Sequence, residues 1–213
     1  NGLLSQMDKL GRISGYYTGA QILLVLVMML LCRIKTVEQL RGHSPGEFGK
    51  LIGLDRIPEV RCLRQKMDTL AGDKNARQWS AAVSRQWFEQ MEHAVGFCYV
   101  DGHVKVYGGQ SELPRRFVSR QRLCLRGISS YWTNDAIGQP LFVVEKQIDA
   151  GLIEALESDI FPELLEQMPG QPSEEVLEAE RHLHRFAVVF DREGSSPNFI
   201  KRAWDEHRIA VLT

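Results

Sequence analysis

The stretch Phe97–Tyr107, with the sequence FCYVDGHVKVY, decides the fold because apolar and polar side chains alternate along it. Its apolar positions are Cys98, Val100, Val104 and Val106, and its polar positions are Tyr99, Asp101, His103 and Lys105. Successive side chains of a β-strand point to opposite faces, so this period of two predicts a strand with one buried face. Aspartate is disfavoured inside strands, so Asp101 requires a specific role.

A second predicted strand offers a partner for Asp101. The run Phe186–Phe190 (FAVVF) is entirely apolar, which is typical of a central strand buried on both faces, and Asp191 follows it directly. Ligands of such sheets gather at strand ends. Two aspartates that are distant in sequence and able to lie side by side therefore indicate a divalent metal site. The alternative is that each is a capping or salt-bridged residue.

The composition is that of a globular chain, with 213 residues of which 44% are hydrophobic. The formal net charge is −1, but the charges are sorted along the chain. Residues 1–95 hold 13 Lys and Arg against 9 Asp and Glu, whereas residues 96–213 hold 13 against 18. Residues 105–126 hold six basic residues and one acid, and residues 149–180 hold ten acids and no base. This sorting predicts surfaces of different charge, with an ordinary solvated face as the alternative for the acidic block.

The cysteines and the most apolar segment exclude several classes of protein. No C-x-x-C motif occurs and no histidine stands at ligand spacing, so we expect neither a zinc site nor a disulfide scaffold but a cytoplasmic protein. The apolar run Ile22–Cys32 has eleven residues, about half of the roughly 20 that span a bilayer, and predicts a buried helix without a membrane partner. The chain lacks an initial Met and stops inside a strand-like segment, so we expect a fragment of a longer protein.

Residues 1–95 are expected to be helical. The segment Ser44–Glu47 has the pattern of a capping box with proline at the first helical position, and a second amphipathic helix follows. Segment 44–71 therefore resembles a helix-turn-helix, whose second helix enters the DNA major groove. Arg61 and Arg64, on one side of that second helix, would then contact phosphates. A plain helical hairpin with solvated arginines is the alternative.

Residues 96–213 change to an alternating pattern, which places a domain boundary at Ala94–Gly96. The segment Arg116–Arg126 is expected to be one strand, with four arginines on one face: Arg116, Arg120, Arg122 and Arg126. These arginines cannot be buried unpaired, so they lie in water or line a groove for phosphates, and we favour the groove beside Asp101. Further along, we expect a helix that Asp149 caps and that Pro162 kinks or divides, and a helix capped by Ser196.

The predicted order of strand, strand, strand, helix, strand, helix and strand resembles the RNase H-like catalytic domain of the DDE transposases of bacterial insertion sequences. The motifs that carry this resemblance are Tyr99–Val104, Tyr131–Asp135 with Gly138–Pro140, and Val189–Gly194. The helical part resembles the segment that precedes this domain in some such transposases, through Arg41–Glu47 and Gly53–Pro58. The expected fold class is therefore α+β, with an all-helical region at 1–95 and a mixed-sheet RNase H-like domain at 96–213 that is incomplete at its C-terminus.

The resemblance implies that Asp101 and Asp191 are catalytic and bind Mg²⁺ or Mn²⁺, while the third acid, a glutamate on a later helix, falls beyond Thr213. The implied partner is double-stranded DNA, both transposon ends and target, and the active form would be a homo-oligomer in the bacterial cytoplasm at the nucleoid. A water would cleave the transposon end, and the freed 3′-hydroxyl would attack the target. His103 would assist the leaving group or hydrogen-bond a metal-bound residue.

Two alternatives remain open from the sequence. One is a non-catalytic DNA-binding protein derived from a truncated or decayed transposase. The other is a metal-dependent hydrolase of a small phosphate ester, which predicts a closed pocket at the two aspartates instead of an open basic groove. Glu193 is considered as the third acid and set aside because it falls in a predicted turn, and Asp135 is interpreted as a turn residue.

Overall fold

The computed structural model describes residues 2, 4–72, 75–90, 96–191 and 195–213. The chain forms two compact units, Asn1–Gln86 and Trp87–Thr213. Helix α4 (Asn75–Gln90) contributes residues to both units. None of the described helices is long and apolar enough to cross a membrane. The predicted boundary at Ala94–Gly96 lies almost wholly outside the described residues and stays a prediction.

The described part of the first unit is helical, as predicted. Its elements are η1 (Met7–Leu10), α1 (Gly19–Leu31), η2 (Val37–Gly42), α2 (Pro45–Lys50), α3 (Val60–Gly72) and the first part of α4. Helix α1 begins with a capping box between Thr18 and Gln21 and buries Ile22, Val25 and Met29. This short apolar helix therefore supplies part of a helical core, as its length indicated.

The segment predicted to resemble a helix-turn-helix contains two helices of unequal length. Helix α2 begins at Pro45, and the Ser44 hydroxyl accepts a hydrogen bond from the Glu47 amide at 3.5 Å. Helix α3 buries Leu63 completely, with Val60, Met67 and Leu70 packed around the same core. Residues 51–59 connect the two helices, a longer link than the 3–4-residue turn that is usual in helix-turn-helix motifs.

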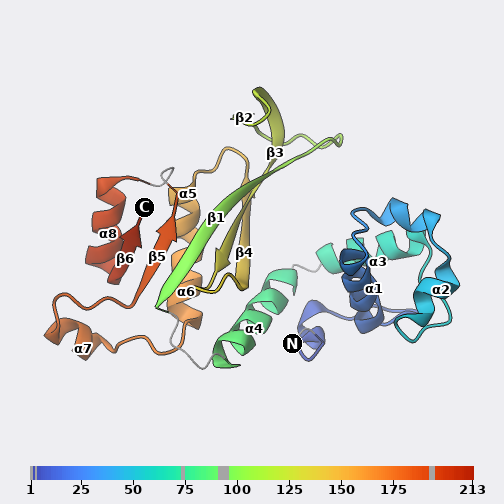
Figure 1. Ribbon diagram of the computed structural model, residues 1–213, viewed down its shortest axis with the longest axis horizontal. Helices are drawn as coiled ribbons and strands as arrows, with labels where there is room; N and C mark the ends of the chain where they lie inside the picture. Colours follow the sequence, from blue (N-terminus) through green and yellow to red (C-terminus); the bar gives the residue numbers. More distant parts are fainter. Residues whose placement is uncertain (1, 3, 73–74, 91–95, 192–194) are drawn as a thin grey trace. The chain divides into compact units, whose positions relative to one another are not determined.

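The second unit is built on a mixed sheet, shown in Figure 1. Its strands are β1 (Phe97–Val106), β2 (Arg115–Val118), β3 (Leu123–Asn134), β4 (Pro140–Gln147), β5 (Phe186–Phe190) and β6 (Ile209–Leu212). Strand β1 lies between β3, which is antiparallel to it, and β5, which is parallel. Strand β4 pairs antiparallel with β3, and β6 pairs parallel with β5. Helices followed by this mixed sheet confirm the predicted α+β class.

The segment Arg116–Arg126 is not the single strand that the alternation predicted. It forms β2, a four-residue turn at 119–122 and the start of β3, so the two strands pair as a hairpin. The amides of Gln121 and Arg122 both donate to the Val118 carbonyl oxygen, and Arg122 has a left-handed φ of 54°. The alternation was misleading because it continues across the turn, where the backbone reverses.

One face of the sheet is covered by helices that follow β4 and β5. These are α5 (Leu152–Ala155), the π-helical segment η3 (Leu156–Ile160), α6 (Phe161–Gln167) and α8 (Pro197–His207). Their buried side chains pack with Cys98, Val100, Val188 and Phe190 into one core. The Ser196 hydroxyl accepts from the Phe199 amide, so Ser196 caps α8 as predicted.

The predicted helix start at Asp149 is wrong. A turn follows β4, in which the Ala150 amide donates to the Gln147 carbonyl oxygen. Because Asp149 lies within this turn, Gly151 is the N-cap of α5. The helix is interrupted near Pro162, as expected: the π-helical segment separates α5 from α6, and Pro162 is the second residue of α6. Proline cannot donate a backbone hydrogen bond, and the wider turn before it accommodates that loss.

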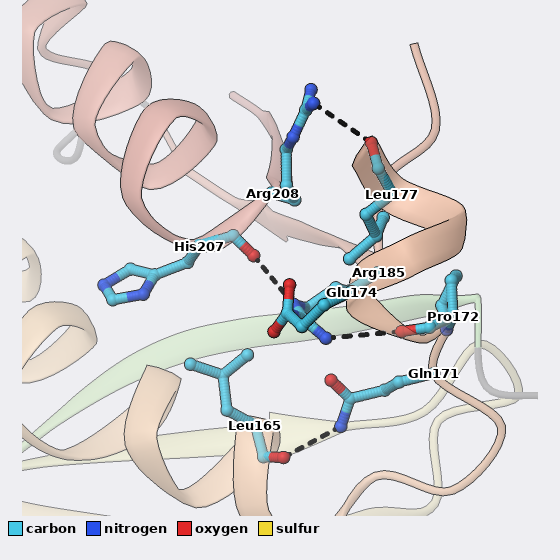
Figure 2. A network of polar contacts seen from close by, with 8 residues as sticks. All are labelled: Leu165, Gln171, Pro172, Glu174, Leu177, Arg185, His207 and Arg208. Atoms are coloured by element: carbon cyan, nitrogen blue, oxygen red, sulfur yellow. Dashed lines mark hydrogen bonds and ion pairs between the residues drawn. The ribbon is translucent and has the colours of Figure 1, made fainter. Parts of the chain in front are cut away.

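A polar network fixes the chain on either side of β5 (Figure 2). The Arg185 guanidinium donates to the carbonyl oxygens of His207 at 3.2 Å and Pro172 at 3.4 Å, and it pairs with Glu174 at the start of α7 (Glu174–Ala179). Gln171 donates to the Leu165 carbonyl oxygen at 2.9 Å. The loop before β5 is therefore tied to α6 and α8, which fixes the strand that leads to Asp191.

Candidate functional site

The register between β1 and β5 determines where the two predicted catalytic aspartates lie. Val100 is paired with Phe190 in the parallel ladder, and the next residues of the two chains are Asp101 and Asp191. Both aspartates are exposed. Asp101 lies within β1, whereas Asp191 is the first residue after β5. The fold thus brings to neighbouring strands two carboxylates that are far apart in sequence.

Asp101 belongs to the face of β1 that the helices leave open. Tyr99 and His103 are its neighbours on this face, and all three residues are exposed, whereas Cys98 and Val100 are buried on the other face. The antiparallel register places Trp132 of β3 directly opposite Asp101. Tyr99 is 45% exposed and Trp132 is 39% exposed. The candidate site is therefore an open surface with aromatic side chains beside a carboxylate.

These aromatic side chains are the part of the site that the sequence analysis missed. Tyr99 and Trp132 both fall in the motifs that carry the family resemblance, but neither was given a role in the site. The alternation along β3 could have identified Trp132. Tyr131 and Thr133 on either side of it are buried, so Trp132 points to the opposite, exposed face. What the sequence lacked was the register that sets Trp132 opposite Asp101.

The covered face beneath the site holds Cys98, which is fully buried. Burial, and secondarily the charge of Asp135, raises the pKa of the Cys98 thiol to about 12. Because the thiolate is the nucleophilic form, this cysteine is inert near neutral pH. The chemistry of the site therefore belongs to the carboxylate face of β1.

Asp135 is a turn residue, as predicted, and not part of the carboxylate pair. Its Oδ1 accepts hydrogen bonds from the amides of Ile137 at 3.0 Å and Gln139 at 2.7 Å. Gly138 has a positive φ of 85°, which suits glycine because it lacks a Cβ. The motif Asn134–Pro140 therefore has a structural explanation, the tight connection between β3 and β4.

The predicted DNA-contacting arginines fall into two groups. Arg61 and Arg64 are exposed on α3, and the Arg64 guanidinium pairs with Glu38 at 2.7 Å. Arg116 lies in β2, while Arg120 and Arg122 lie in the turn of the hairpin. The prediction that the last three share one strand face is wrong, because the turn separates them. Their contact with DNA stays a prediction.

The donor set at the candidate site consists of hard oxygen ligands, which suits Mg²⁺ bound by one or two carboxylates together with substrate phosphates. Among the described residues, no group of three or more His, Cys, Asp or Glu gathers in a metal-binding arrangement. Glu193, considered above as a third acid, lies outside the described residues. The oxygen donors of Asp101 and Asp191 are of the type that Mg²⁺ prefers, and their binding of a metal ion stays a prediction.

The strand order β4-β3-β1-β5-β6, with only the pairs β1–β5 and β5–β6 parallel, defines the second unit as an RNase H-like domain. A family model described as "Transposase protein" (Transposase_29) matches residues 1–213. The chain therefore belongs to this transposase family. A comparison with curated proteins finds no match.

Two solved structures illustrate the similarity. The chain is similar to piggyBac transposase in the cryo-EM structure of its synaptic complex with hairpin DNA, with 13% identity and a TM-score of 0.50 over 99% of this chain and 48% of that chain. It is also matched to Mos1 transposase in a paired-end complex with the left transposon end, with 8% identity and a TM-score of 0.31 over 95% of this chain and 60% of that chain. The first likeness supports the fold, and the chain spans about half the length of that piggyBac chain.

Proposed function

We propose that this chain forms the helical region and the first part of the catalytic domain of a DDE-type transposase that cleaves and joins DNA with a divalent metal ion. The observation that carries the proposal is the parallel register of β1 and β5, in which Asp101 and Asp191 directly follow the paired residues Val100 and Phe190. Family membership supports the same activity. The partners would be the ends of the mobile element and a target duplex, bound by a homo-oligomer in the bacterial cytoplasm.

The spacing of the strands supports a shared metal site. Neighbouring strands lie about 4.8 Å apart, and side chains at equivalent positions point to the same face. If the register continues for one residue, the two carboxylates face the same space at about that separation. This distance suits metal ions held roughly 4 Å apart for an in-line displacement at phosphorus.

Bound Mg²⁺ or Mn²⁺ would activate the attacking oxygen and stabilise the leaving oxygen of the phosphodiester. The chain's own residues position the reactants. The two aspartates supply negative charge from within β1 and from directly after β5, and the helices packed beneath β1 and β5 hold those strands in place. His103, exposed two residues beyond Asp101 on the same face, is placed to donate a hydrogen bond to a phosphate oxygen or to the leaving group.

The aromatic residues beside Asp101 give the DNA strand a surface for its bases. A phosphate held at the carboxylates has its attached bases within a few ångströms, and Trp132 lies directly opposite Asp101 on the same face. Nucleobases stack on exposed aromatic rings without requiring a particular sequence. Trp132 and Tyr99 would therefore orient the strand whose phosphodiester is cut.

The open surface also argues against a hydrolase of small phosphate esters. Such an enzyme encloses most of its ligand in a pocket. Asp101, Asp191 and the flanking aromatic residues are instead exposed. An extended polymer such as DNA can lie along this face, whereas a small ester would remain in contact with bulk water.

The test is to replace Asp101 or Asp191 by Asn in the full-length protein and to measure Mg²⁺-dependent cleavage of a duplex that carries the element's ends. We expect each variant to bind DNA and to cleave it about a thousandfold more slowly or worse, because a catalytic metal contributes several kcal/mol and each 1.4 kcal/mol is a factor of ten. The matched control is Asp205→Asn, which removes the same charge from an exposed position on α8.

Survival of cleavage in either variant would exclude that residue from the metal site. A wild-type protein that binds the duplex and does not cleave it with Mg²⁺ or Mn²⁺ would instead favour the second possibility, a non-catalytic DNA-binding protein derived from a transposase.

A further inference from the structure

The hairpin Arg115–Arg126 is a strongly basic segment of the second unit. Its twelve residues, RRFVSRQRLCLR, include five arginines and no acid. Arg115, Arg116, Arg120 and Arg122 are exposed, and Arg126 is half-buried. Within the described part of the chain, no ion pair joins any of these five arginines to an acid. The hairpin therefore carries a concentrated positive charge that the protein itself does not neutralise.

The hairpin extends beyond the main sheet. Residues 123–126 of β3 pair with β2, whereas residues 127–134 pair with β1 and residues 128–134 with β4. Figure 1 shows β2 and the start of β3 projecting past the end of the sheet. The exposed apolar side chains Phe117 and Leu123, at 57% and 58%, lie near its tip. Strand β2 and the start of β3 therefore form a two-stranded ribbon with exposed side chains on both faces.

Two local features cost free energy in the isolated protein. Arg115 and Arg126 are paired directly across the ladder, and like charges at opposed positions of an antiparallel pair destabilise it. Arg122 occupies a left-handed conformation with φ 54°, which glycine or asparagine adopts more easily. An anion bound between the opposed arginines would relieve the first cost. The second is set by the turn, in which the Arg122 amide donates to the Val118 carbonyl oxygen.

The distribution of the arginines selects the kind of contact. Cross-strand partners share a face, so Arg115 and Arg126 lie on one face of the ribbon, Arg116 lies on the other, and Arg120 and Arg122 lie at the tip. A ribbon lying flat on DNA would need its cations on one face. Cations on both faces and at the tip suit a ribbon with phosphates on either side of it, as in a groove of a duplex.

We propose that the hairpin Arg115–Arg126 enters the major groove of double-stranded DNA. The major groove is about 12 Å wide and admits a two-stranded β-ribbon, whereas the minor groove, about 6 Å wide, is too narrow. Arg120 and Arg122 at the tip reach base edges, the arginines on the two faces contact the phosphates of the opposite strands, and Phe117 meets thymine methyl groups. The inference rests on the proposed function only for its partner, since groove binding needs neither Asp101 nor a metal ion.

The experiment measures binding of the full-length protein to a mixed-sequence duplex in EDTA, so that catalysis plays no part. The variant Arg120→Ala/Arg122→Ala should bind about tenfold more weakly or worse, while the salt slope of log K changes little, because these two side chains reach base edges and not phosphates. Arg202→Ala is the matched control, because its guanidinium is exposed but already paired with Glu157. It should bind like the wild type.

A modified duplex tests which groove is used. Glucosylated 5-hydroxymethylcytosine fills the major groove and leaves the minor groove open, because the C5 position of a pyrimidine faces the major groove. The wild type should bind this duplex at least tenfold more weakly than the unmodified one, and the double variant should bind both alike. Netropsin, which occupies the minor groove, should leave wild-type binding unchanged. Equal wild-type binding to the two duplexes, or competition by netropsin, would overturn the proposal.

A second variant separates DNA contact from folding. Arg115→Gln removes the like-charge pair with Arg126, so its melting temperature should equal or exceed that of the wild type while its DNA affinity falls. Unchanged affinity in both hairpin variants would exclude the ribbon as a DNA contact. This binding test and the cleavage test can fail separately. If Asp101→Asn still cleaved DNA, the catalytic proposal would be wrong, but the hairpin variants should still bind DNA more weakly than the wild type.

Discussion

The two faces of the central strand β1 differ in what covers them, although their residues alternate along one short segment. Cys98 and Val100 lie under helices α5, α6 and α8 in a closed core, while Tyr99, Asp101 and His103 lie on an open face. One strand therefore serves stability on one side and, in our proposal, chemistry on the other. Adjacent residues of β1 should therefore respond to substitution in different ways, one in stability and the next in activity.

The largest effect on stability is expected on the covered face. Leu164 of α6 is fully buried in that core, so Leu164→Ala should lower the free energy of unfolding by about 2–5 kcal/mol through reduced burial and a residual cavity. Ile137→Ala, at an 87% exposed turn position, should change it by less than about 0.5 kcal/mol. Urea denaturation measures both. A small loss for Leu164→Ala would mean that this face is not the principal core.

A smaller effect, on activity instead of stability, is expected at Trp132 on the open face. If Trp132 stacks a base beside Asp101, Trp132→Ala should slow cleavage by about tenfold or more, since such stacking contributes about 1–3 kcal/mol per base. The aromatic replacement Trp132→Phe should keep most of the rate. Cleavage assays with saturating DNA provide the measurement, and equal rates for the Ala and Phe variants would contradict a stacking role.

The smallest effect should be a dependence of stability on pH at buried Cys98. Because the pKa of Cys98 is about 12 in the folded protein against an ordinary 9.0, its contribution to stability is complete below pH 9 and is lost as the pH rises towards 12. The difference in unfolding free energy between the wild type and Cys98→Ala should therefore shrink over that interval.

Val100, on the same covered face, supplies the control for this measurement. Valine has no ionisable group, so the difference between the wild type and Val100→Ala should stay constant over that interval. Denaturation titrations on both sides of pH 9 decide the matter. A constant difference between the wild type and Cys98→Ala across the interval would show that the Cys98 thiol ionises as easily in the folded protein as in the unfolded one.

Much of the fold was predictable because local chemistry dictates it. The alternation at Phe97–Tyr107 predicted β1, the apolar run before Asp191 predicted β5, and the serines at positions 44 and 196 predicted the starts of α2 and α8. Asp135 was recognised as a turn residue from its setting between two strands. In each case one short segment holds the whole signal, since capping, turns and strand alternation act over a few residues.

Two predictions were wrong because the local sequence pattern was compatible with two different backbone conformations. The arginine alternation over Arg116–Arg126 continues through a chain reversal, so the sequence could not distinguish one strand from a hairpin. Asp149 is a good capping residue, yet a turn after β4 places Gly151 at the helix start instead. The position of the hairpin turn and the start of α5 depend on how β3 and β4 pack against neighbouring strands. A local pattern of side chains does not contain that information.

The sequence by itself determined the mixed order of strands and helices, the burial of one face of β1 and the presence of two strand-associated aspartates, because each follows from periodicity and local preference. Only the tertiary structure decided that β1 and β5 are parallel in a register that pairs Val100 with Phe190, the residues before Asp101 and Asp191. It also decided that Trp132 lies opposite Asp101 and that the arginines form a projecting ribbon. Register and pairing are set by contacts between segments far apart in the chain, where packing of the shared core selects one alignment among several that the local patterns permit.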